Sequence, residues 1–405
     1  MTAVPRSAPR ARQATTLWAT AALVAAGAAA VLAGLAALRP ALPALLSGYP
    51  SWVVDYAHPA TFLRWIVGDT TEPTYVKTAL AGALMLLGAA AAHWAYRRGR
   101  RWRGFDISYG TGLWPWLATS AVLGLVLSDL AWGWTIGASG TWQPTFVPFV
   151  SVPPAVVLVY GAGWAVTLTG AALGAVLTTP VALLVVNYVC YPLGLPTVVG
   201  ATTGMWVGAL IAFAICRVLP WMPRPASAPA ESPEPGEPPV ASTVPAQGPA
   251  WVGRRILADF TEAQFYGNEW ASAGLLAGTV LSYLLNPALP IYGSGLLPQV
   301  LAAQVLTAAI AVVLWRRQWA HAGWYPTFVP VVSVAPATVL AFGGTVPSIV
   351  AGAVLGALAG PPLAAWVARR LPAHFHPFIG NVVSMTVCTV IVVSVLRLVP
   401  GFHTT

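Results

Sequence analysis

The sequence contains little charge. Only 8% of its 405 residues are Asp, Glu, Lys or Arg, whereas 57% are apolar. Soluble domains carry about one quarter charged residues, so this composition excludes a soluble globular enzyme, a disordered chain and a fibrous one. The mean hydropathy of +0.72 and repeated apolar runs of about 20 residues predict an all-α integral membrane protein, because helices satisfy their own backbone hydrogen bonds within lipid.

Cysteine and catalytic motifs are also scarce. The three cysteines, Cys190, Cys216 and Cys388, are far apart and form no C-x-x-C pair, which argues against a zinc or redox site. Nucleotide-binding, H-E-x-x-H and G-x-S-x-G patterns are absent from the sequence. We therefore expect no enzyme activity, no cofactor and no bound metal. An integral membrane enzyme is kept as a disfavoured alternative.

Eleven apolar runs are long enough to be transmembrane helices. The fourth and fifth runs are barely separated, as are the ninth and tenth, so each pair is either a tight hairpin or one broken, re-entrant element. The runs are 17–38, 78–96, 113–134, 145–164, 165–186, 197–219, 265–285, 296–315, 327–344, 347–367 and 378–399.

Basic residues give the orientation. With the N-terminus inside, sixteen arginines fall in inside segments and four basic residues fall outside, which is the bias of the positive-inside rule. The net charge of +9 thus reflects topology and not nucleic-acid binding. The Ala- and Arg-rich composition is typical of a bacterium. We predict a multi-pass protein of the inner (plasma) membrane, with the N-terminus cytoplasmic and the C-terminus outside.

A long internal repeat is present. The sequence from Pro144, PTFVPFVSVPPAVVLVYG, matches that from Pro326, PTFVPVVSVAPATVLAFG, at thirteen of eighteen positions. Five predicted spans separate the equivalent residues Arg217 and Arg397. Because five is odd, the two units have opposite orientations in the membrane. The prediction is a five-plus-five inverted-topology repeat with one additional N-terminal helix, a construction found in secondary transporters.

The repeat divides the chain into four parts. Residues 1–73 form the N-terminal helix and an outer loop, and residues 74–222 form the first repeat of five helices. A Pro-rich segment, 223–250, is expected to be a cytoplasmic linker because it lacks the apolar residues needed for a core. Residues 251–405 form an amphipathic interfacial helix and the second repeat of five helices.

The duplicated proline motifs are the predicted binding site. Proline removes a backbone N–H, and unwound backbone at membrane depth is tolerated only against protein or a watery cavity. We expect both motifs to meet near the pseudo-two-fold axis and to bind a solute or ion. The alternative is that the prolines kink packed helices and the serines bond their own backbone. The candidate residues are Thr145, Pro148, Ser151, Pro154, Thr327, Pro330, Ser333, Pro336, Asn381 and Ser384.

Asp129 is the one acidic residue clearly within a predicted span. An intramembrane carboxylate is a functional candidate, so Asp129 is the candidate for ion coupling, although a position near the outer end of its helix would expose it to water. With few buried acids expected, proton coupling through a chain of carboxylates is not favoured. Sodium coupling and uncoupled passage stay open.

The segment 352–381, GAVLGALAGPPLAAWVARRLPAHFHPFIGN, resembles a family of bacterial multispan membrane proteins of unknown function. The overall pattern is similar to five-plus-five inverted-repeat secondary transporters with broken helices. The expected function is a secondary transporter or facilitator that moves a small solute by alternating access. The alternative is a flippase or exporter of a lipid-linked or amphipathic molecule, whose phosphate would suit the basic inner rim. The expected partners are the lipid bilayer and a small solute or ion, and a homo-oligomer is compatible with the sequence.

Overall fold

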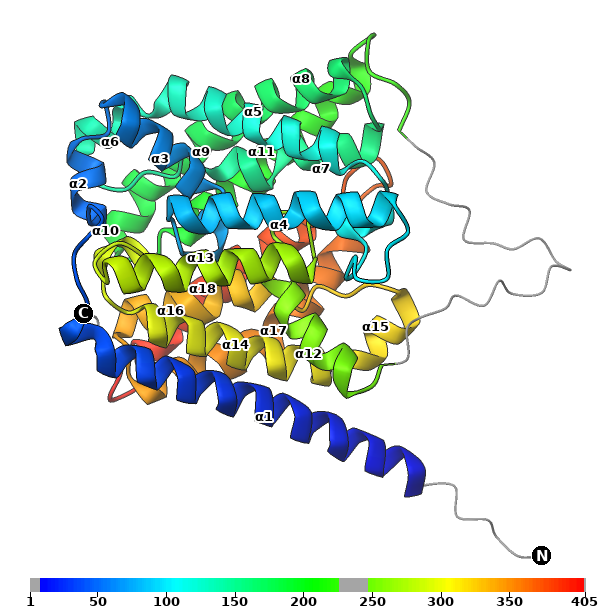
Figure 1. Ribbon diagram of the computed structural model, residues 1–405. Helices are drawn as coiled ribbons and strands as arrows, with labels where there is room; N and C mark the ends of the chain where they lie inside the picture. The colour runs from blue at the N-terminus through cyan, green and yellow to red at the C-terminus, as the bar shows by residue number, and fades with distance from the viewer. Residues whose placement is uncertain (1–7, 226–246, 404–405) are drawn as a thin grey trace, which may run out of the picture.

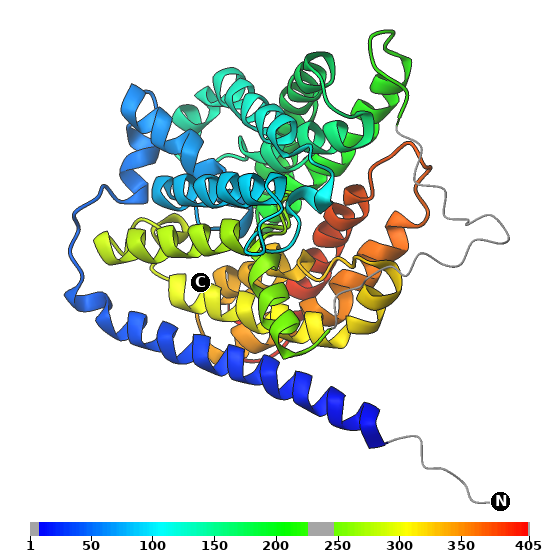
Figure 2. The same ribbon diagram turned by 45° about the vertical axis from the view of Figure 1, so that its right-hand side comes forward.

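The computed structural model describes residues 8–225 and 247–403, and within them the fold is all-α (Figure 1). Most of the expected Pro-rich linker lies outside the described residues, as does Arg6 of the N-terminal basic stretch. The long helices run roughly parallel to one another in two halves. Helices α4 (Ala79–Arg97) and α13 (Glu269–Leu285) lie side by side between these halves (Figures 1 and 2).

Eight helices in the described residues are long and apolar enough to cross a membrane, which confirms a multi-pass helical membrane protein. One of them is continuous from α8 to α10 and contains two π-helical turns, η5 and η6. The eight are α1 (Ala8–Leu38), α4 (Ala79–Arg97), α5 (Trp114–Trp132), α8–α10 (Trp164–Leu193), α11 (Val198–Val218), α14 (Leu297–Leu314), α17 (Val346–Ala368) and α18 (Phe378–Leu396).

The remaining three predicted spans are shorter. Helix α13 (Glu269–Leu285) has 17 residues. The two proline motifs are broken helices, in which a 3-10 turn precedes a nine-residue α-helix. The first is η4 (Val147–Val150) with α7 (Val152–Tyr160), and the second is η9 (Val329–Val332) with α16 (Val334–Phe342). Each broken helix is about 21 Å long at 1.5 Å per residue, less than the ~30 Å of bilayer hydrocarbon.

The proline-broken segment nevertheless runs the length of the bundle. Before it, the Trp142 carbonyl accepts a hydrogen bond of 3.0 Å from Tyr191, at the end of the continuous helix α8–α10. After it, Trp164 begins that same helix. The segment between the two tryptophans therefore connects opposite ends of the helix instead of turning back on itself. In the second half, Tyr325 stacks near Trp315 at one end of α14, and Gly344 lies beside Gln299 at the other.

Helices α4 and α13 approach closely because glycines face the partner backbone. A Cβ atom on Gly88 would lie 2.3 Å from the carbonyl oxygen of Trp270, and one on Gly278 would lie 2.5 Å from that of Leu80. Gly88 and Gly278 are 190 residues apart, as are Leu80 and Trp270. The contact is thus reciprocal, as in an interface between two-fold related units.

The two ends of the bundle are distinguished by Arg217 and Arg397. Arg397, after α18, donates hydrogen bonds to the carbonyls of Leu193 and Gly194, just before α11 begins. Arg217 lies in the last turn of α11. The two equivalent arginines therefore lie at opposite ends of the packed pair α11 and α18. We name the end with Arg397 the C-terminal face and the end with Arg217 the linker face.

Helix α1 lies along the outside of the second half, against α12 and α14 (Figures 1 and 2). The remaining short elements connect the long helices. They are η1 (Arg39–Ala41), α2 (Tyr49–Val54), α3 (Pro59–Asp69), η2 (Glu72–Thr74), η3 (Ile107–Gly110), α6 (Trp134–Ser139), α8 (Trp164–Leu173), η5 (Gly174–Thr178), α9 (Thr179–Val185), η6 (Val186–Cys190), α10 (Tyr191–Leu193), α12 (Pro249–Ala258), η7 (Asp259–Thr261), η8 (Ile291–Gly293) and α15 (Arg316–Ala322).

Candidate functional site

A short motif, Asp-x-Thr-Glu, occurs twice at an offset of 190 residues. The copies run from Asp69 to Glu72 and from Asp259 to Glu262. Each copy lies where a short helix, α3 or α12, passes into a 3-10 turn. The motif precedes α4 in the first half and α13 in the second, so both copies lead into the reciprocal contact between the halves.

The backbone after each motif adopts the same unusual conformation. Tyr75 and its equivalent Phe265 have φ of 66° and 63°, and Lys77 and its equivalent Gly267 have φ of 42° and 53°. In both copies the next side chain caps the following helix. Positive φ is uncommon for non-glycine residues and often occurs where function constrains the backbone. The repeated strain therefore marks both loops as candidates for function.

The first motif forms a buried triad with Lys77. The Lys77 ammonium contacts Asp69 Oδ1 and lies 3.3 Å from Glu72 Oε2. The other oxygen of Asp69 accepts a hydrogen bond of 3.2 Å from Thr145, which in turn accepts one of 3.4 Å from the Trp65 indole. The three side chains Asp69, Glu72 and Lys77, at about 1% exposure each, are the first triad.

The second motif forms an equivalent triad with Arg255. The Arg255 guanidinium lies 2.8 Å from Asp259 Oδ1 and 2.5 Å from Glu262 Oε2. Asp259 Oδ1 also accepts a hydrogen bond of 3.2 Å from Thr327, which accepts one of 3.4 Å from the Trp319 indole. Arg255, Asp259 and Glu262, none more than 5% exposed, are the second triad.

Both triads pair one cation with two acids, but the cation comes from a different position of the repeat in each triad. The cation follows the acids in the first triad, as Lys77, and precedes them in the second, as Arg255. The position equivalent to Lys77 is Gly267, where a Cβ atom would lie 2.4 Å from Glu262 Oε2. The position equivalent to Arg255 is Trp65, whose ring lies 3.8 Å from the Lys77 ammonium. A cation paired with two acids is thus retained in each half although its position is not.

Each triad is tied to the other half of the protein through its glutamate. Glu72 Oε1 accepts hydrogen bonds of 2.7 Å from Trp142 and 2.6 Å from Tyr292, and the tyrosine belongs to the second half. We name Glu72, Trp142 and Tyr292 the C-terminal gate, because Tyr292 precedes α14, whose first turn lies at the C-terminal face.

The equivalent set at the other end is Glu262, Trp324 and Tyr109, which we name the linker gate. Trp324 donates a hydrogen bond of 2.8 Å to Glu262 Oε1. Tyr109, of the first half, lines the same cavity as Glu262 and packs edge-on against Trp324, with ring centroids 6.3 Å apart. Tyr109 and Tyr292 occupy equivalent Tyr-Gly-x-Gly loops with φ of 60° and 55°. Each gate therefore crosses between the halves in the same way.

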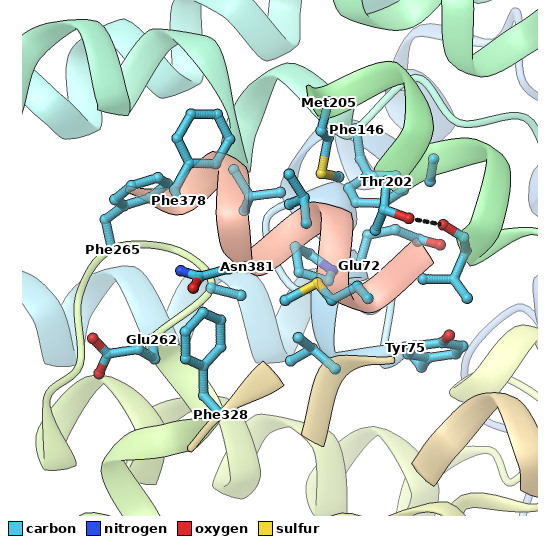
Figure 3. Close-up of a pocket in the computed structure, with 18 of the residues that line it drawn as sticks. Glu72, Tyr75, Phe146, Thr202, Met205, Glu262, Phe265, Phe328, Phe378 and Asn381 are labelled. Atoms are coloured by element: carbon cyan, nitrogen blue, oxygen red, sulfur yellow. Dashed lines mark hydrogen bonds between the residues drawn. The ribbon is translucent and has the colours of Figure 1, made fainter. Parts of the chain in front are cut away.

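A cavity of about 60 Å³ lies between the two gates (Figure 3). Its wall is mainly aromatic and aliphatic, and Glu72 and Glu262 are its only charged lining residues among those the structure describes. Most lining residues occur in equivalent pairs from the two halves. These pairs are Glu72 and Glu262, Tyr75 and Phe265, Tyr109 and Tyr292, Phe146 and Phe328, Val150 and Val332, Val198 and Phe378, Ala201 and Asn381, Thr202 and Val382, and Met205 and Met385.

The two ends of the cavity differ. Toward the C-terminal face, Tyr75, Thr197 and Val198 line both the cavity and a second, larger cleft of about 810 Å³ that contains Arg397. At the other end Phe265 packs against Phe378, with ring centroids 5.8 Å apart, and Figure 3 shows the two rings together. The cavity is therefore closer to solvent at the C-terminal face.

Burial changes the proton affinity of acids in both triads. It raises the pKa of Glu72 above the ordinary carboxyl value, although hydrogen bonds from Tyr292 and Trp142 oppose the change. Burial likewise raises the pKa of Asp259 to about 7, against the attraction of Arg255. Both acids lie outside the eight candidate spans. Carboxyls with such values take up protons near neutral pH.

Among the sequence-predicted residues, the two threonines contact the triads, whereas the two serines do not line the cavity. Thr145 and Thr327 bond Asp69 and Asp259. Ser151 and Ser333 are buried, and their hydroxyls donate to the carbonyls four residues earlier, at 2.6 and 2.7 Å. The serines thus have the local role that the alternative interpretation expected. The cavity wall comes instead from Phe146, Val150 and their equivalents.

The other predicted residues either line the cavity or are buried in contacts within and between helices. Asn381 lines the cavity. Ser384 donates a hydrogen bond of 2.7 Å to the Gly360 carbonyl of α17. The four candidate prolines, Pro148, Pro154, Pro330 and Pro336, are buried within or beside the broken helices. Asp129 is buried beside Tyr56, whose hydroxyl lies 3.4 Å from Oδ1.

The expectation that buried acids are scarce is wrong. Asp69, Glu72, Asp259 and Glu262 are buried together with Asp129. The sequence placed the first two in an outer loop and the last two in an interfacial helix, because their neighbourhoods are polar. The repeated Asp-x-Thr-Glu motif could have identified them, but its offset differs from the 182 residues of the proline motif. Among the described residues, no group of three or more His, Cys, Asp or Glu is placed to hold a metal ion.

No known protein family matches the chain, and no characterised protein matches its sequence. Function is therefore inferred from the geometry of the cavity, the triads and the gates.

Proposed function

We propose that the protein is a secondary transporter or facilitator that moves a small solute across the plasma membrane by alternating access between two inverted repeats. The observation that carries this proposal is the central cavity, whose wall consists of equivalent residues from both halves. A cavity on a pseudo-two-fold axis is where inverted-repeat transporters bind solute. We place the solute there, between the two gates.

The inverted topology is supported by the two ends of the bundle. The equivalent arginines Arg217 and Arg397 lie at opposite faces, and α4 and α13 contact each other reciprocally through Gly88 and Gly278. We count the two proline-broken segments and α13 as crossings, which gives eleven. The linker face is then cytoplasmic and the C-terminal face is outside.

The gates supply the two states of the cycle. The structure has both gates formed, and the cleft at the C-terminal face reaches the cavity wall at Tyr75 and Val198. Opening the C-terminal gate requires breaking the bond between Glu72 and Tyr292, which belong to different halves. The equivalent motion at the linker gate separates Glu262 from Tyr109. Because the halves are equivalent, opening one face while the other stays closed yields two states related by the same axis.

The test is side-specific labelling of two equivalent cavity residues. Val198→Cys and Phe378→Cys are made separately in a chain whose three cysteines, all buried, are replaced by alanine. A membrane-impermeant maleimide is then added to sealed vesicles of known orientation. Val198→Cys should react from the C-terminal face and Phe378→Cys from the linker face. Arg397→Cys and Arg217→Cys, at the two ends, report the orientation of the chain.

Two results would contradict the proposal. If both cavity cysteines react from one face only, the cavity has one entrance and does not alternate. If Arg217→Cys and Arg397→Cys react from a common side, the repeats are not inverted. Vesicles that pass the labelling test are then screened for uptake of labelled solutes, with the double variant Glu72→Gln and Glu262→Gln as the matched control.

A further inference from the structure

The second triad contains one more negative charge than positive. Asp259 and Glu262 are both buried against a single guanidinium, that of Arg255. The neighbouring Arg254 pairs instead with Glu269, at 2.6 Å, and is half exposed. An uncompensated buried carboxylate costs several kcal/mol, so the excess charge of the triad must be neutralised by a bound positive species.

One carboxylate oxygen of the second triad has no partner. Asp259 Oδ2 is buried without a hydrogen bond, whereas Oδ1 accepts from both Arg255 and Thr327. Both oxygens of Glu262 are occupied, by Trp324 and Arg255. Buried polar atoms almost always have a partner. A carboxylic acid protonated at Oδ2 would remove the unpartnered acceptor and the excess charge together.

The first triad has the same imbalance. Asp69 and Glu72 face Lys77. Asp129, which is also buried, follows Ser128, whose hydroxyl donates a hydrogen bond of 2.7 Å to the carbonyl of Thr145, the residue that bonds Asp69. Three carboxylates therefore lie near one ammonium. Asp129 Oδ2 is buried without a hydrogen-bond partner, and Glu72 Oε2 has no contact of this kind besides its ion pair with Lys77 at 3.3 Å. The other titratable groups that face the two triads are the phenols Tyr49, Tyr56, Tyr75, Tyr292 and Tyr109, which are neutral and supply no counter-charge.

We propose that each triad binds one exchangeable proton, on Asp259 in the second and within the Asp69, Glu72 and Asp129 group in the first. The positions that a metal cation would need are already taken by the Lys77 ammonium and the Arg255 guanidinium. The described residues also contain no set of ligands arranged for a metal ion. A proton needs only a free carboxylate oxygen. Asp259 Oδ2 in the second triad and Asp129 Oδ2 beside the first triad are such atoms.

The proton sites have a consequence that rests on the proposed function. Glu72 also accepts a hydrogen bond from Tyr292 of the other half, and Glu262 lines the cavity together with Tyr109 of the other half. Hydrogen bonds to ionised acceptors are roughly twice as strong as neutral ones, so a proton on Glu72 weakens the C-terminal gate. A proton on Asp259 leaves Glu262 ionised and acts on the linker gate through Arg255, the cation that both acids share. Proton binding on one side of the membrane would then favour opening there, and solute movement would be coupled to a proton gradient.

The test measures the protons directly. The full chain is placed in lipid nanodiscs, and infrared difference spectra are recorded between mildly acidic and mildly alkaline pH. A carbonyl band of protonated carboxyl groups should disappear as the pH rises. Asp259→Asn should remove one component of the band, and Glu72→Gln should diminish the other. The matched control is Asp55→Asn, an exposed acid outside both triads, which should leave the band unchanged.

Three results would overturn the inference. They are the absence of a titrating band, a band that persists unaltered in both Asp259→Asn and Glu72→Gln, and a titration that moves when sodium replaces choline. The last result would assign the sites to a metal cation. Because the two substitutions lie in different triads, misfolding of one leaves the other as a test. The measurement uses no solute, so a chain that titrates but fails side-specific labelling would retain its proton sites and lose the transport proposal.

Discussion

Removing the Tyr292 hydroxyl should open the C-terminal gate without disturbing the linker gate. In Tyr292→Phe, Glu72 Oε1 loses a hydrogen bond of 2.6 Å and keeps the one from Trp142. A hydrogen bond to a charged group contributes about 1.5–3 kcal/mol, and about 1.4 kcal/mol corresponds to a tenfold change in an equilibrium constant. If this bond exists only while the gate is closed, the open population should rise by roughly 10- to 100-fold.

The assay is the rate at which an impermeant maleimide labels Val198→Cys from the C-terminal face. Tyr292→Phe should accelerate this rate and should leave the labelling of Phe378→Cys from the linker face unchanged. The control is Tyr283→Phe, because Tyr283 is fully buried in α13 and its hydroxyl has no partner. An unchanged rate in Tyr292→Phe, or an acceleration only at the opposite face, would refute the role of the Glu72 bond as a gate.

Three further outcomes are expected. Gly88→Leu should destabilise the protein by about 1–3 kcal/mol, because its side chain would collide with the Trp270 carbonyl; Gly27→Leu, with no atom within 4 Å, should leave the thermal midpoint in detergent unchanged. Lys77→Ala should lower the free energy of unfolding by about 3–5 kcal/mol, because it leaves two buried acids without a counter-charge. A thermal midpoint equal to that of the parent chain would show that the triad is not buried in the folded protein. The pKa of Asp259 is raised to about 7 by burial, so the folded chain holds this proton more tightly than the unfolded chain and the associated stability is lost as pH rises from about 4 to about 7. Thermal midpoints should fall across that window in the parent chain and fall less in Asp259→Asn, and equal slopes would contradict the pKa.

The class of the protein could be predicted from its sequence because hydrophobicity is a local property. Runs of about 20 apolar residues mark most of the spanning helices. The twin PTFVP segments lie in equivalent places, and each supplies a threonine that bonds a triad aspartate and a phenylalanine that lines the cavity. The breaks at Pro148 and Pro330 were also predictable, since proline disrupts the preceding turn. Whether the broken segments turn back could not be read from their length and required the contacts of their ends.

The repeated Asp-x-Thr-Glu motif marks the acids of the triads, but their burial could not be predicted, because burial of a charge depends on partners far along the chain. Asp69 and Lys77 lie in a polar stretch that resembles a loop, and their environment is completed by Thr145, 76 residues beyond Asp69. The cations of the two triads also occupy different positions in the repeat, so an alignment of the halves pairs Lys77 with a glycine and Arg255 with a tryptophan. Sequence equivalence is lost there while charge balance is kept.

Helix α1 has no counterpart among the described helices of the first half, and its main contacts are with α12 and α14 of the second half. Two identical halves would favour neither of the two conformations, because neither half would be larger or better anchored than the other. Helix α1 makes the two halves unequal. If the halves move as proposed, we expect the second half, which packs along α1, to keep its position in the membrane while the first half moves.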